Sequence, residues 1–227
     1  MIITVAHQKG GTGKSTLSTN LCGYMKTDLL DMDKQFSSAS WNARRIANGK
    51  YPGIPTITVE EQHCKVPYQT PVPLANLWKG IVRKYKGNAE NHLVIDCPGF
   101  ESDALCVAIW LSDYVLTPVA PSQIEVYGLE IFEQVIKKAE TLGDGKRKIV
   151  SHVVINNADN RSKQRTMELR DYVNSDPHYT LCRTSITRNM AFWDAYKNGC
   201  TVPEFKSNGS AMEVKLLAQE IMDTLGI

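Results

Sequence analysis

The chain has 227 residues, of which 42% are hydrophobic and 22% charged, and its formal net charge is +2. This size and composition are typical of one globular domain, which we expect to span residues 1–227, and they exclude a disordered or fibrous protein. The nearly neutral total also excludes nucleic-acid binding through overall charge alone. Charge is unevenly spread, however, because residues 137–190 hold eleven Lys/Arg and six Asp/Glu.

The six cysteines form no C-x-x-C pair and no regular framework. This pattern favours free, mostly buried thiols in a reducing compartment over disulfides. Residues 1–6 lead directly into a glycine-rich loop rather than forming a signal peptide, and no apolar stretch approaches the ~20 residues of a membrane span. We therefore expect a cytoplasmic protein with no membrane partner.

Strands and helices alternate along the chain. Short apolar runs suited to buried parallel strands lie at residues 2–6, 28–31, 54–59, 92–96, 114–119 and 149–155, with a weaker one at 179–183. Helical patterns lie at residues 14–25, 38–48, 74–85, 102–111, 124–142, 162–174, 189–198 and 211–225. The alternation predicts an α/β fold with a mostly parallel twisted sheet and helices on both faces. The Pro-rich residues 51–73 are the least regular, and we expect a surface excursion there.

The last predicted helix raises the alternative of a membrane-surface helix. Its apolar stripe comprises Met212, Leu216, Leu217, Ile221, Met222 and Leu225. A membrane-surface helix needs a basic polar face to meet anionic lipid, but this polar face is net acidic. We therefore expect the stripe to pack on the core.

A glycine-rich segment at residues 7–16, His-Gln-Lys-Gly-Gly-Thr-Gly-Lys-Ser-Thr, follows the first predicted strand and begins the first predicted helix. In this setting backbone N–H groups can surround a phosphate. The strict pattern G-x-x-x-x-G-K-[ST] fails because Gln8 replaces its first glycine. We expect Lys14 to contact the β- and γ-phosphates, the Ser15 hydroxyl to bind Mg²⁺ and Thr16 to reach the α-phosphate. The predicted nucleotide-binding residues are Gly10, Gly11, Thr12, Gly13, Lys14, Ser15 and Thr16.

Carboxylates follow two of the predicted strands. Asp31 and Asp33 lie one residue apart at the end of the second strand, so an extended chain directs both to the same side. An ordinary surface turn is an equal alternative for that pair. Asp96 ends the apolar run at residues 92–96, as expected of a carboxylate that holds Mg²⁺ through water.

The segment Lys9-Gly-Gly-Thr-Gly-Lys-Ser-Thr16 resembles the deviant Walker A motif of the ParA/MinD superfamily of dimeric ATPases. The resemblance implies a weak ATPase that binds ATP and Mg²⁺, in which Lys9 reaches across a homodimer to the partner's nucleotide. A cation from a second subunit would neutralise charge on the transferred phosphoryl group, as an arginine finger does. The alternative is a solvated loop lysine.

Three further positions match the superfamily. Residues 31–35 resemble its D-x-D-P-Q segment, with Lys34 in place of proline, and the match implies that Asp33 positions the attacking water and that Asp31 supports the Mg²⁺ shell. Residues 96–99 resemble its D-x-P-G switch, which senses the γ-phosphate. Asn156 matches a position that hydrogen-bonds adenine, although an asparagine after a strand is also a common turn residue.

Residues 35–41, 117–122 and 183–189 resemble segments of small plasmid-partition ParA proteins. This implies that the ATP-bound dimer binds non-specific DNA, associates with the nucleoid and responds to a ParB-like partner. Arg183 and Arg188 match positions where basic residues contact the DNA backbone, and each such contact adds sequence-independent affinity. The alternative is that both arginines only solubilise the surface.

Other members of the superfamily remain as alternatives. A MinD-like positioning ATPase would need a basic amphipathic C-terminus. An iron–sulphur carrier would use cysteines such as Cys97 and Cys106, which are more simply core thiols. A metabolic synthetase or a conjugation accessory ATPase of the VirC type is harder to separate from a partition protein by sequence.

Overall fold

The computed structural model describes residues 1–60, 63–65, 72–88, 90–142, 145–158, 163–206 and 209–227. Its strands are β1 (Ile2–Val5), β2 (Asp28–Asp31), β3 (Thr56–Glu60), β4 (His63–Lys65), β5 (Val72–Pro73), β6 (Leu93–Asp96), β7 (Tyr114–Val119), β8 (Ser151–Ala158) and β9 (Tyr179–Thr187). Its helices are α1 (Lys14–Met25), α2 (Ser37–Asn48), α3 (Leu74–Tyr85), α4 (Asp103–Leu111), α5 (Gln123–Glu140), α6 (Lys163–Ser175), α7 (Met190–Lys197), α8 (Val202–Phe205) and α9 (Gly209–Leu225).

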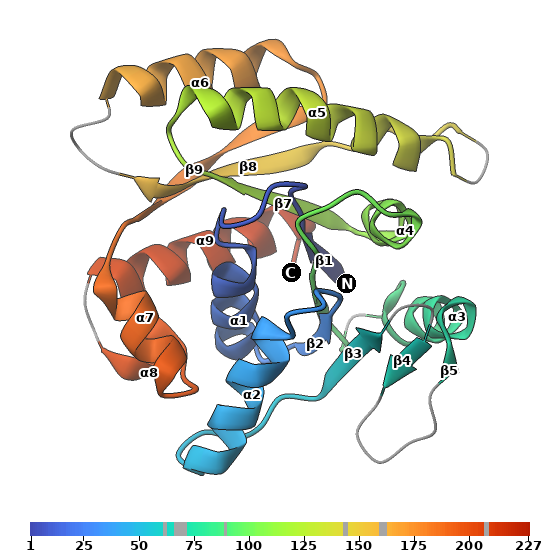
Figure 1. Cartoon of the computed structure of the whole chain (residues 1–227), viewed down its shortest axis with the longest axis vertical. Helices are drawn as coiled ribbons and strands as arrows, with labels where there is room; N and C mark the ends of the chain where they lie inside the picture. Colours follow the sequence, from blue (N-terminus) through green and yellow to red (C-terminus); the bar gives the residue numbers. More distant parts are fainter. Residues whose placement is uncertain (61–62, 66–71, 89, 143–144, 159–162, 207–208) are drawn as a thin grey trace.

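All these strands join one sheet in the order β5-β4-β3-β2-β6-β1-β7-β8-β9. Seven strands that are consecutive in this spatial order, β3-β2-β6-β1-β7-β8-β9, pair in parallel. The strands β4 and β5 are antiparallel additions at the β3 edge. Helices cover both faces (Figure 1). The predicted α/β fold with a mostly parallel sheet is therefore confirmed.

The core consists of two apolar layers, one on each face of the sheet. Alternate residues of β1 point to opposite faces, so Ile2 packs in the layer under α3–α6, while Ile3 packs in the layer under α1, α2 and α9. The central strands β1 and β6 are buried throughout, because helices lie on both of their sides. This burial fixes the carboxyl ends of neighbouring strands in register, and those ends carry the predicted site residues.

Two expectations about the periphery were wrong in part. Within residues 51–73, where we expected a surface excursion after a strand at 54–59, that strand is present as β3, but β4 and β5 also extend the sheet; residues 61–62 and 66–71 lie outside the described chain. In α9, Leu217 and Ile221 pack on the core, but Met212 and Leu216 are exposed. The buried face of α9 is formed by Val214, Leu217, Ala218 and Ile221, so the outer members of the apolar stripe lie beyond this face and stay exposed. Among the described helices, none is long and apolar enough to cross a bilayer.

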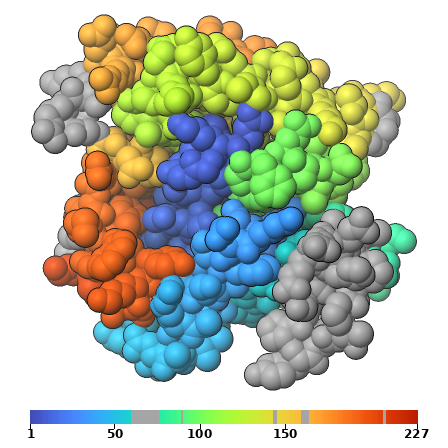
Figure 2. Space-filling model, viewed as in Figure 1, coloured from blue at the N-terminus to red at the C-terminus, as the bar shows by residue number. Residues whose placement is uncertain are grey.

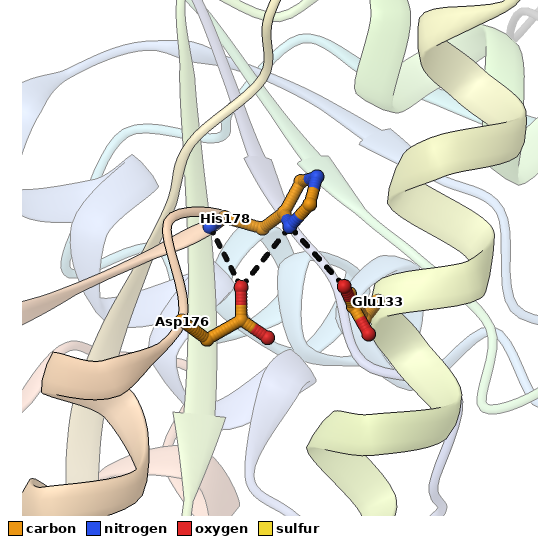
Figure 3. Close-up of side chains that lie close together, drawn as sticks. All are labelled: Glu133, Asp176 and His178. Atoms are coloured by element: carbon orange, nitrogen blue, oxygen red, sulfur yellow. Dashed lines mark hydrogen bonds and ion pairs between the residues drawn. The ribbon is translucent and has the colours of Figure 1, made fainter.

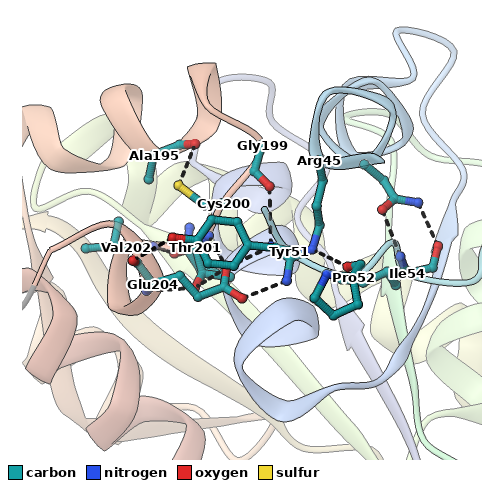
Figure 4. Close-up of polar contacts among 12 residues, drawn as sticks. Arg45, Tyr51, Pro52, Ile54, Ala195, Gly199, Cys200, Thr201, Val202 and Glu204 are labelled. Atoms are coloured by element: carbon teal, nitrogen blue, oxygen red, sulfur yellow. Dashed lines mark hydrogen bonds and ion pairs between the residues drawn. The ribbon is translucent and has the colours of Figure 1, made fainter. Parts of the chain in front are cut away.

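A buried polar cluster fastens α2 to the C-terminal part of the chain (Figure 4). Arg45 is almost fully buried and forms a bidentate ion pair with Glu204, with its Nη1 and Nη2 atoms 2.7 and 2.6 Å from the two carboxylate oxygens. Its Nε donates to the Pro52 carbonyl. Glu204 also accepts from the backbone N–H of Thr201 in a capping box at the start of α8. The cluster thus holds α2 in place behind the site.

The described cysteines agree with the expectation of free thiols. Cys22, Cys97, Cys106, Cys182 and Cys200 are buried and unbridged. Burial raises the thiol pKa of each. The side chain of the sixth, Cys64, lies outside the described part of the structure.

Candidate functional site

The loop between β1 and α1 is held in a tight curl. Gly11 and Gly13 have φ angles of +77° and +96°, which side chains rarely tolerate. A Cβ atom on Gly13 would lie 2.1 Å from Nδ2 of Asn156, and this same Nδ2 donates to the Thr12 carbonyl at 2.7 Å. The glycine therefore lets the end of β8 support the loop directly. We refer to residues 7–13 as the phosphate loop.

Lys14, the first residue of α1, directs its side chain back into this loop. Its Nζ atom donates to the Lys9 carbonyl at 2.8 Å, and the residue is only 6% exposed. Burial lowers the pKa of Lys14, while the charges of Asp96 and Asp33 oppose that effect. The structure therefore places a poorly solvated cation at the centre of the phosphate loop.

Asp96 and Asp31 end neighbouring parallel strands, where they are paired in register. Asp96 is fully buried and accepts hydrogen bonds from the hydroxyls of Ser18 at 3.2 Å and Ser38 at 2.5 Å. Burial and the charge of Asp31 raise the pKa of Asp96 to about 7, although hydroxyl groups and Lys14 pull it down. A further cation nearby would stabilise the ionised form of Asp96.

The segment between β2 and α2 is organised by its own aspartates. Asp31 accepts from the backbone N–H groups of Asp33 and Ala39, at 3.0 and 2.9 Å. Asp33 accepts from the N–H of Gln35 at 2.9 Å, and it is close enough to raise the pKa of Lys14. Asp31 thus fastens the segment, while Asp33 keeps a partly exposed carboxylate beside the phosphate loop. The turn forms with Lys34 at the position where the resembling motif has proline.

The D-x-P-G segment contacts the phosphate loop from another side. A Cβ atom on Gly99 would lie 3.0 Å from the backbone nitrogen of Gly10. The loop after β6 therefore packs closely on the loop after β1, as expected for two neighbouring parallel strands. A side chain at position 99 would therefore collide with the backbone of the phosphate loop.

A cavity of about 650 Å³ continues from the phosphate loop to α7 (Figure 2). One end is lined by Gly11, Gly13, Ser15 and Thr16, and the middle by Asn156 and Arg188. The other end is lined mainly by side chains of α7: Met190, Phe192, Trp193 and Tyr196. Binding cavities for small ligands have about this volume, so the space fits a ligand with an anionic end and an aromatic end.

Residues 3–202 match the CobQ/CobB/MinD/ParA nucleotide-binding domain family. The chain belongs to this family. The match covers the phosphate loop, Asp31, Asp33, Asp96 and Asn156, which the structure brings together at one edge of the sheet. The chain is therefore a nucleotide-binding protein of the MinD/ParA type, as the motif predicted.

Individual relatives within the family share most of the chain's length. The maintenance of carboxysome distribution protein A of Halothiobacillus neapolitanus is 25% identical over 97% of this chain and 95% of its own. A plasmid partition protein of Borrelia burgdorferi, solved with AMPPNP, superposes with a TM-score of 0.64 at 19% identity, covering 98% of both chains. The MinD cell division protein of Aquifex aeolicus gives a TM-score of 0.68 at 15% identity, over 98% and 97% of the two chains. The two structures establish the fold alone.

Three predicted site residues remain to be placed, all within the described chain, and their side chains do not contact the aspartates beside Lys14. Lys9 forms an ion pair with Glu125 of its own chain, with Nζ and Oε1 2.5 Å apart. Arg183 is exposed on β9 beside Glu220 and Asp223, at 3.8 and 4.0 Å. Arg188 is exposed just after β9 and lines the cavity. The two arginines predicted to contact DNA thus have different surroundings, since only Arg183 lies between carboxylates of α9.

Sequence reasoning missed four residues that contribute to the site. Ser18 lies one helical turn after Lys14, and Ser38 lies near the start of α2; both spacings could have been noticed. Trp193 lies in a short helix with two other aromatic residues, which was a weaker signal. Glu125 had no signal, because only the tertiary fold brings α5 against the phosphate loop.

A cluster of ionisable side chains farther along α5 is explained by ion pairs (Figure 3). Nδ1 of His178 lies 3.0 Å from Asp176 and 3.3 Å from Glu133. The same Glu133 oxygen also pairs with Lys137 at 2.6 Å. The three groups are near enough to share a metal ion, but Lys137 and Nδ1 of His178 already contact these carboxylates. The cluster fastens α5 to the start of β9.

Proposed function

We propose that this chain is a Mg²⁺-dependent ATPase with weak intrinsic turnover that forms a homodimer around ATP and positions or partitions a cargo on DNA. The observation that carries the proposal is the buried amine of Lys14, which is folded into the phosphate loop on the Lys9 carbonyl, with Asp33 and Asp96 close enough to raise its pKa. A lysine in a glycine-rich loop with two carboxylates nearby is the arrangement that phosphoryl transfer requires. The protein would act in the cytoplasm, associated with the nucleoid.

The phosphate loop fits a triphosphate. Its glycines leave the backbone N–H groups of residues 10–16 available to phosphate oxygens, with Lys14 beside them. The Thr12 hydroxyl is buried and has no hydrogen-bond partner among the described residues, so a bound oxygen would satisfy it. At the far end of the cavity, the aromatic face of α7 suits a nucleobase, and Asn156 could bond adenine after releasing the Thr12 carbonyl.

Mg²⁺ would be held by Ser15 and, through water, by Asp96, with Asp31 in support. The raised pKa of Asp96 fits this role, because a divalent cation would restore the ionised carboxylate. The ion would draw negative charge from the phosphate oxygens. Asp33 would orient the attacking water, since it is less buried than Asp31, the last residue of β2.

An exposed apolar stripe supports a dimer. Ile124, Tyr127 and Ile131 lie on one face of α5, and all three are exposed. In the space-filling view, the part of α5 nearest the phosphate loop lies directly above it (Figure 2). A second copy packed on this stripe would bring its own Lys9 toward the nucleotide, where a cation would help to neutralise the transition state.

Binding to DNA and to a ParB-like partner rests on the resemblance and on relatives named for carboxysome distribution and plasmid partition. Arg188 is the better residue to test, because Glu220 and Asp223 beside Arg183 oppose DNA at that position. The experiment compares retention of the full chain on non-specific duplex DNA with ATP and with ADP. We expect retention with ATP only, longer retention for Asp33→Ala, and loss of retention for Arg188→Glu.

Two controls make this test specific. Arg170→Glu carries the same charge change on the exposed side of α6 and should retain DNA. Because Arg188 also lines the cavity, ATP affinity must be measured for Arg188→Glu, and its DNA retention is compared with wild type at ATP concentrations that saturate both proteins. Equal retention with ATP and ADP would contradict a partition-type function.

A further inference from the structure

The ion pair between Lys9 and Glu125 joins two groups with different freedom to move. The Glu125 side chain is 7% exposed in the first turn of α5, whereas that of Lys9 is 35% exposed at the mouth of the phosphate loop. Lys9 can therefore leave toward solvent or a second chain, but the carboxylate must stay. A buried carboxylate without a partner is costly, so Glu125 opposes the departure of Lys9.

The imidazole of His7 lies beside this carboxylate. The other oxygen of Glu125, Oε2, and Nε2 of His7 are buried, lack hydrogen-bond partners among the described residues and lie 3.9 Å apart. Nδ1 of His7 accepts the Lys9 backbone N–H at 2.9 Å, so the proton of the neutral ring is on Nε2. Burial, followed by the charges of Lys14 and Lys9, lowers the pKa of His7 to about 3 and keeps the ring neutral. A shift of about 1 Å would let Nε2–H donate to Glu125.

We propose that Glu125 is a positioning residue that holds Lys9 within its own chain until a second copy of the chain binds, and that His7 then takes over the carboxylate. The inference rests on the proposed ATP-dependent dimer and adds its regulation. The inference explains why Oε2 of Glu125 and Nε2 of His7 are buried without hydrogen-bond partners among the described residues, which a permanent Lys9–Glu125 pair would not explain.

The position of the pair couples it to the surface that a second chain would cover. Ile124 and Tyr127 of the exposed stripe flank Glu125 on the same helix. A copy that packs on them comes close to Lys9 and offers this cation a new anionic partner in its nucleotide. Release of Lys9 and burial of the stripe would then happen together, which would keep the isolated chain nearly inactive.

The first experiment tests, in the full chain without nucleotide, whether Glu125 holds Lys9 in place; we call this contact the lock. An amine-acylating reagent is applied to wild type, Glu125→Gln and Glu130→Gln, and acylation of Lys9 is measured by mass spectrometry relative to Lys215. Glu130 is the matched control because it is exposed on the same helix, and Lys215 is exposed on α9. We expect Lys9 acylation to rise severalfold in Glu125→Gln only. Unchanged acylation would overturn the lock.

The second experiment measures dimerisation with ATP by analytical ultracentrifugation. Glu125→Gln should dimerise about fivefold more tightly than wild type, the effect of losing one partly exposed ion pair. In a Lys9→Ala background the same substitution should change nothing, whereas a merely structural role would act in both backgrounds. Weaker or unchanged dimerisation of Glu125→Gln would overturn the positioning role.

The two experiments separate this inference from the proposed function. If no variant dimerises with ATP, the proposed function fails, but acylation of Lys9 still decides whether the lock exists. If Glu125→Gln unfolds, Glu125→Asp keeps the charge on a shorter side chain and should give intermediate acylation. Wild-type acylation in a folded Glu125→Asp variant would count against the lock.

Discussion

Two buried polar clusters of this molecule differ in how completely their members are satisfied. In the Arg45 cluster, a bidentate ion pair and backbone hydrogen bonds occupy Arg45 and Glu204 (Figure 4). Around the phosphate loop, by contrast, Lys14 has a lowered pKa, Asp96 a raised one, and the Thr12 hydroxyl has no partner among the described residues. Both clusters are buried, but only the first is complete.

The difference separates a structural cluster from one that is built for a ligand. Burying a charge is costly, and the Arg45 cluster recovers the cost within the chain. Around the phosphate loop, contacts within the chain do not offset all of this cost. A bound triphosphate and Mg²⁺ would offset the rest. Substitutions in the first cluster should therefore affect folding, and substitutions in the second should affect nucleotide chemistry.

The largest expected effect is that of Lys14→Ala on ATP turnover. Loss of the cation from the phosphate loop should reduce the rate at least about 1,000-fold. Thermal stability should stay close to wild type, because the substitution removes a charge whose burial is unfavourable. Lys215→Ala, on the exposed side of α9, is the matched control and should leave turnover unchanged. A large fall in the melting temperature of Lys14→Ala would contradict the distinction between the two clusters.

The second prediction concerns the Arg45 cluster, where a substitution should reduce stability rather than turnover. Arg45→Ala should lower the free energy of unfolding by about 3–5 kcal/mol, because it leaves Glu204 unpaired. Urea unfolding measures the loss, and ATP affinity of the folded fraction should change little. Replacing both partners, as Arg45→Met with Glu204→Leu, should recover much of the stability. A double variant no more stable than Arg45→Ala would contradict this account.

The same pair predicts a dependence of stability on pH. Burial alone would raise the pKa of Glu204, but hydrogen bonds from Arg45 and the Thr201 N–H lower it below the ordinary value of 4.5. Because the folded pKa is the lower one, the pair stabilises above pH 4.5, and this contribution is lost as the pH falls toward the folded pKa. Stability of Glu204→Gln should consequently depend less on pH in that range.

The smallest expected effect concerns the aromatic end of the cavity. Trp193→Ala should weaken ATP affinity about tenfold, the usual cost of losing one base-stacking side chain. Trp193→Phe keeps an aromatic face and should lose much less. Isothermal titration with ATP and with inorganic triphosphate sharpens the test, because triphosphate affinity should not change. An equal loss for both ligands would place the base elsewhere.

Much of the fold was predictable because local pattern and burial agree. The strands β1, β2, β6 and β7 are short apolar runs buried on both faces, and their spacing by helices implies parallel pairing. The strands β4 and β5 were not predictable to the same degree. The Pro-rich composition around them resembles a loop, and only pairing with the edge of the sheet makes these short segments into strands.

The candidate site divides in the same way. Gly13, Lys14, Asp33 and Asp96 were found from the sequence, because each depends on its distance from a strand end. Their assigned roles in binding and hydrolysis stay predictions. Glu125 and Trp193 were not found, because their contribution depends on helices α5 and α7, which are distant from the phosphate loop in the sequence.

The phosphate loop, the alternation of strands and helices and the carboxylates at the ends of β2 and β6 could be read from the amino-acid sequence, since these are local patterns of a few residues. The carboxylate that holds Lys9, the helix that closes the cavity and the charges left unsatisfied became visible in the folded chain alone. These depend on distances between segments more than a hundred residues apart along the chain, as with Lys9 and Glu125 at 2.5 Å. Burial gives such contacts their strength, and burial is a property of the folded chain.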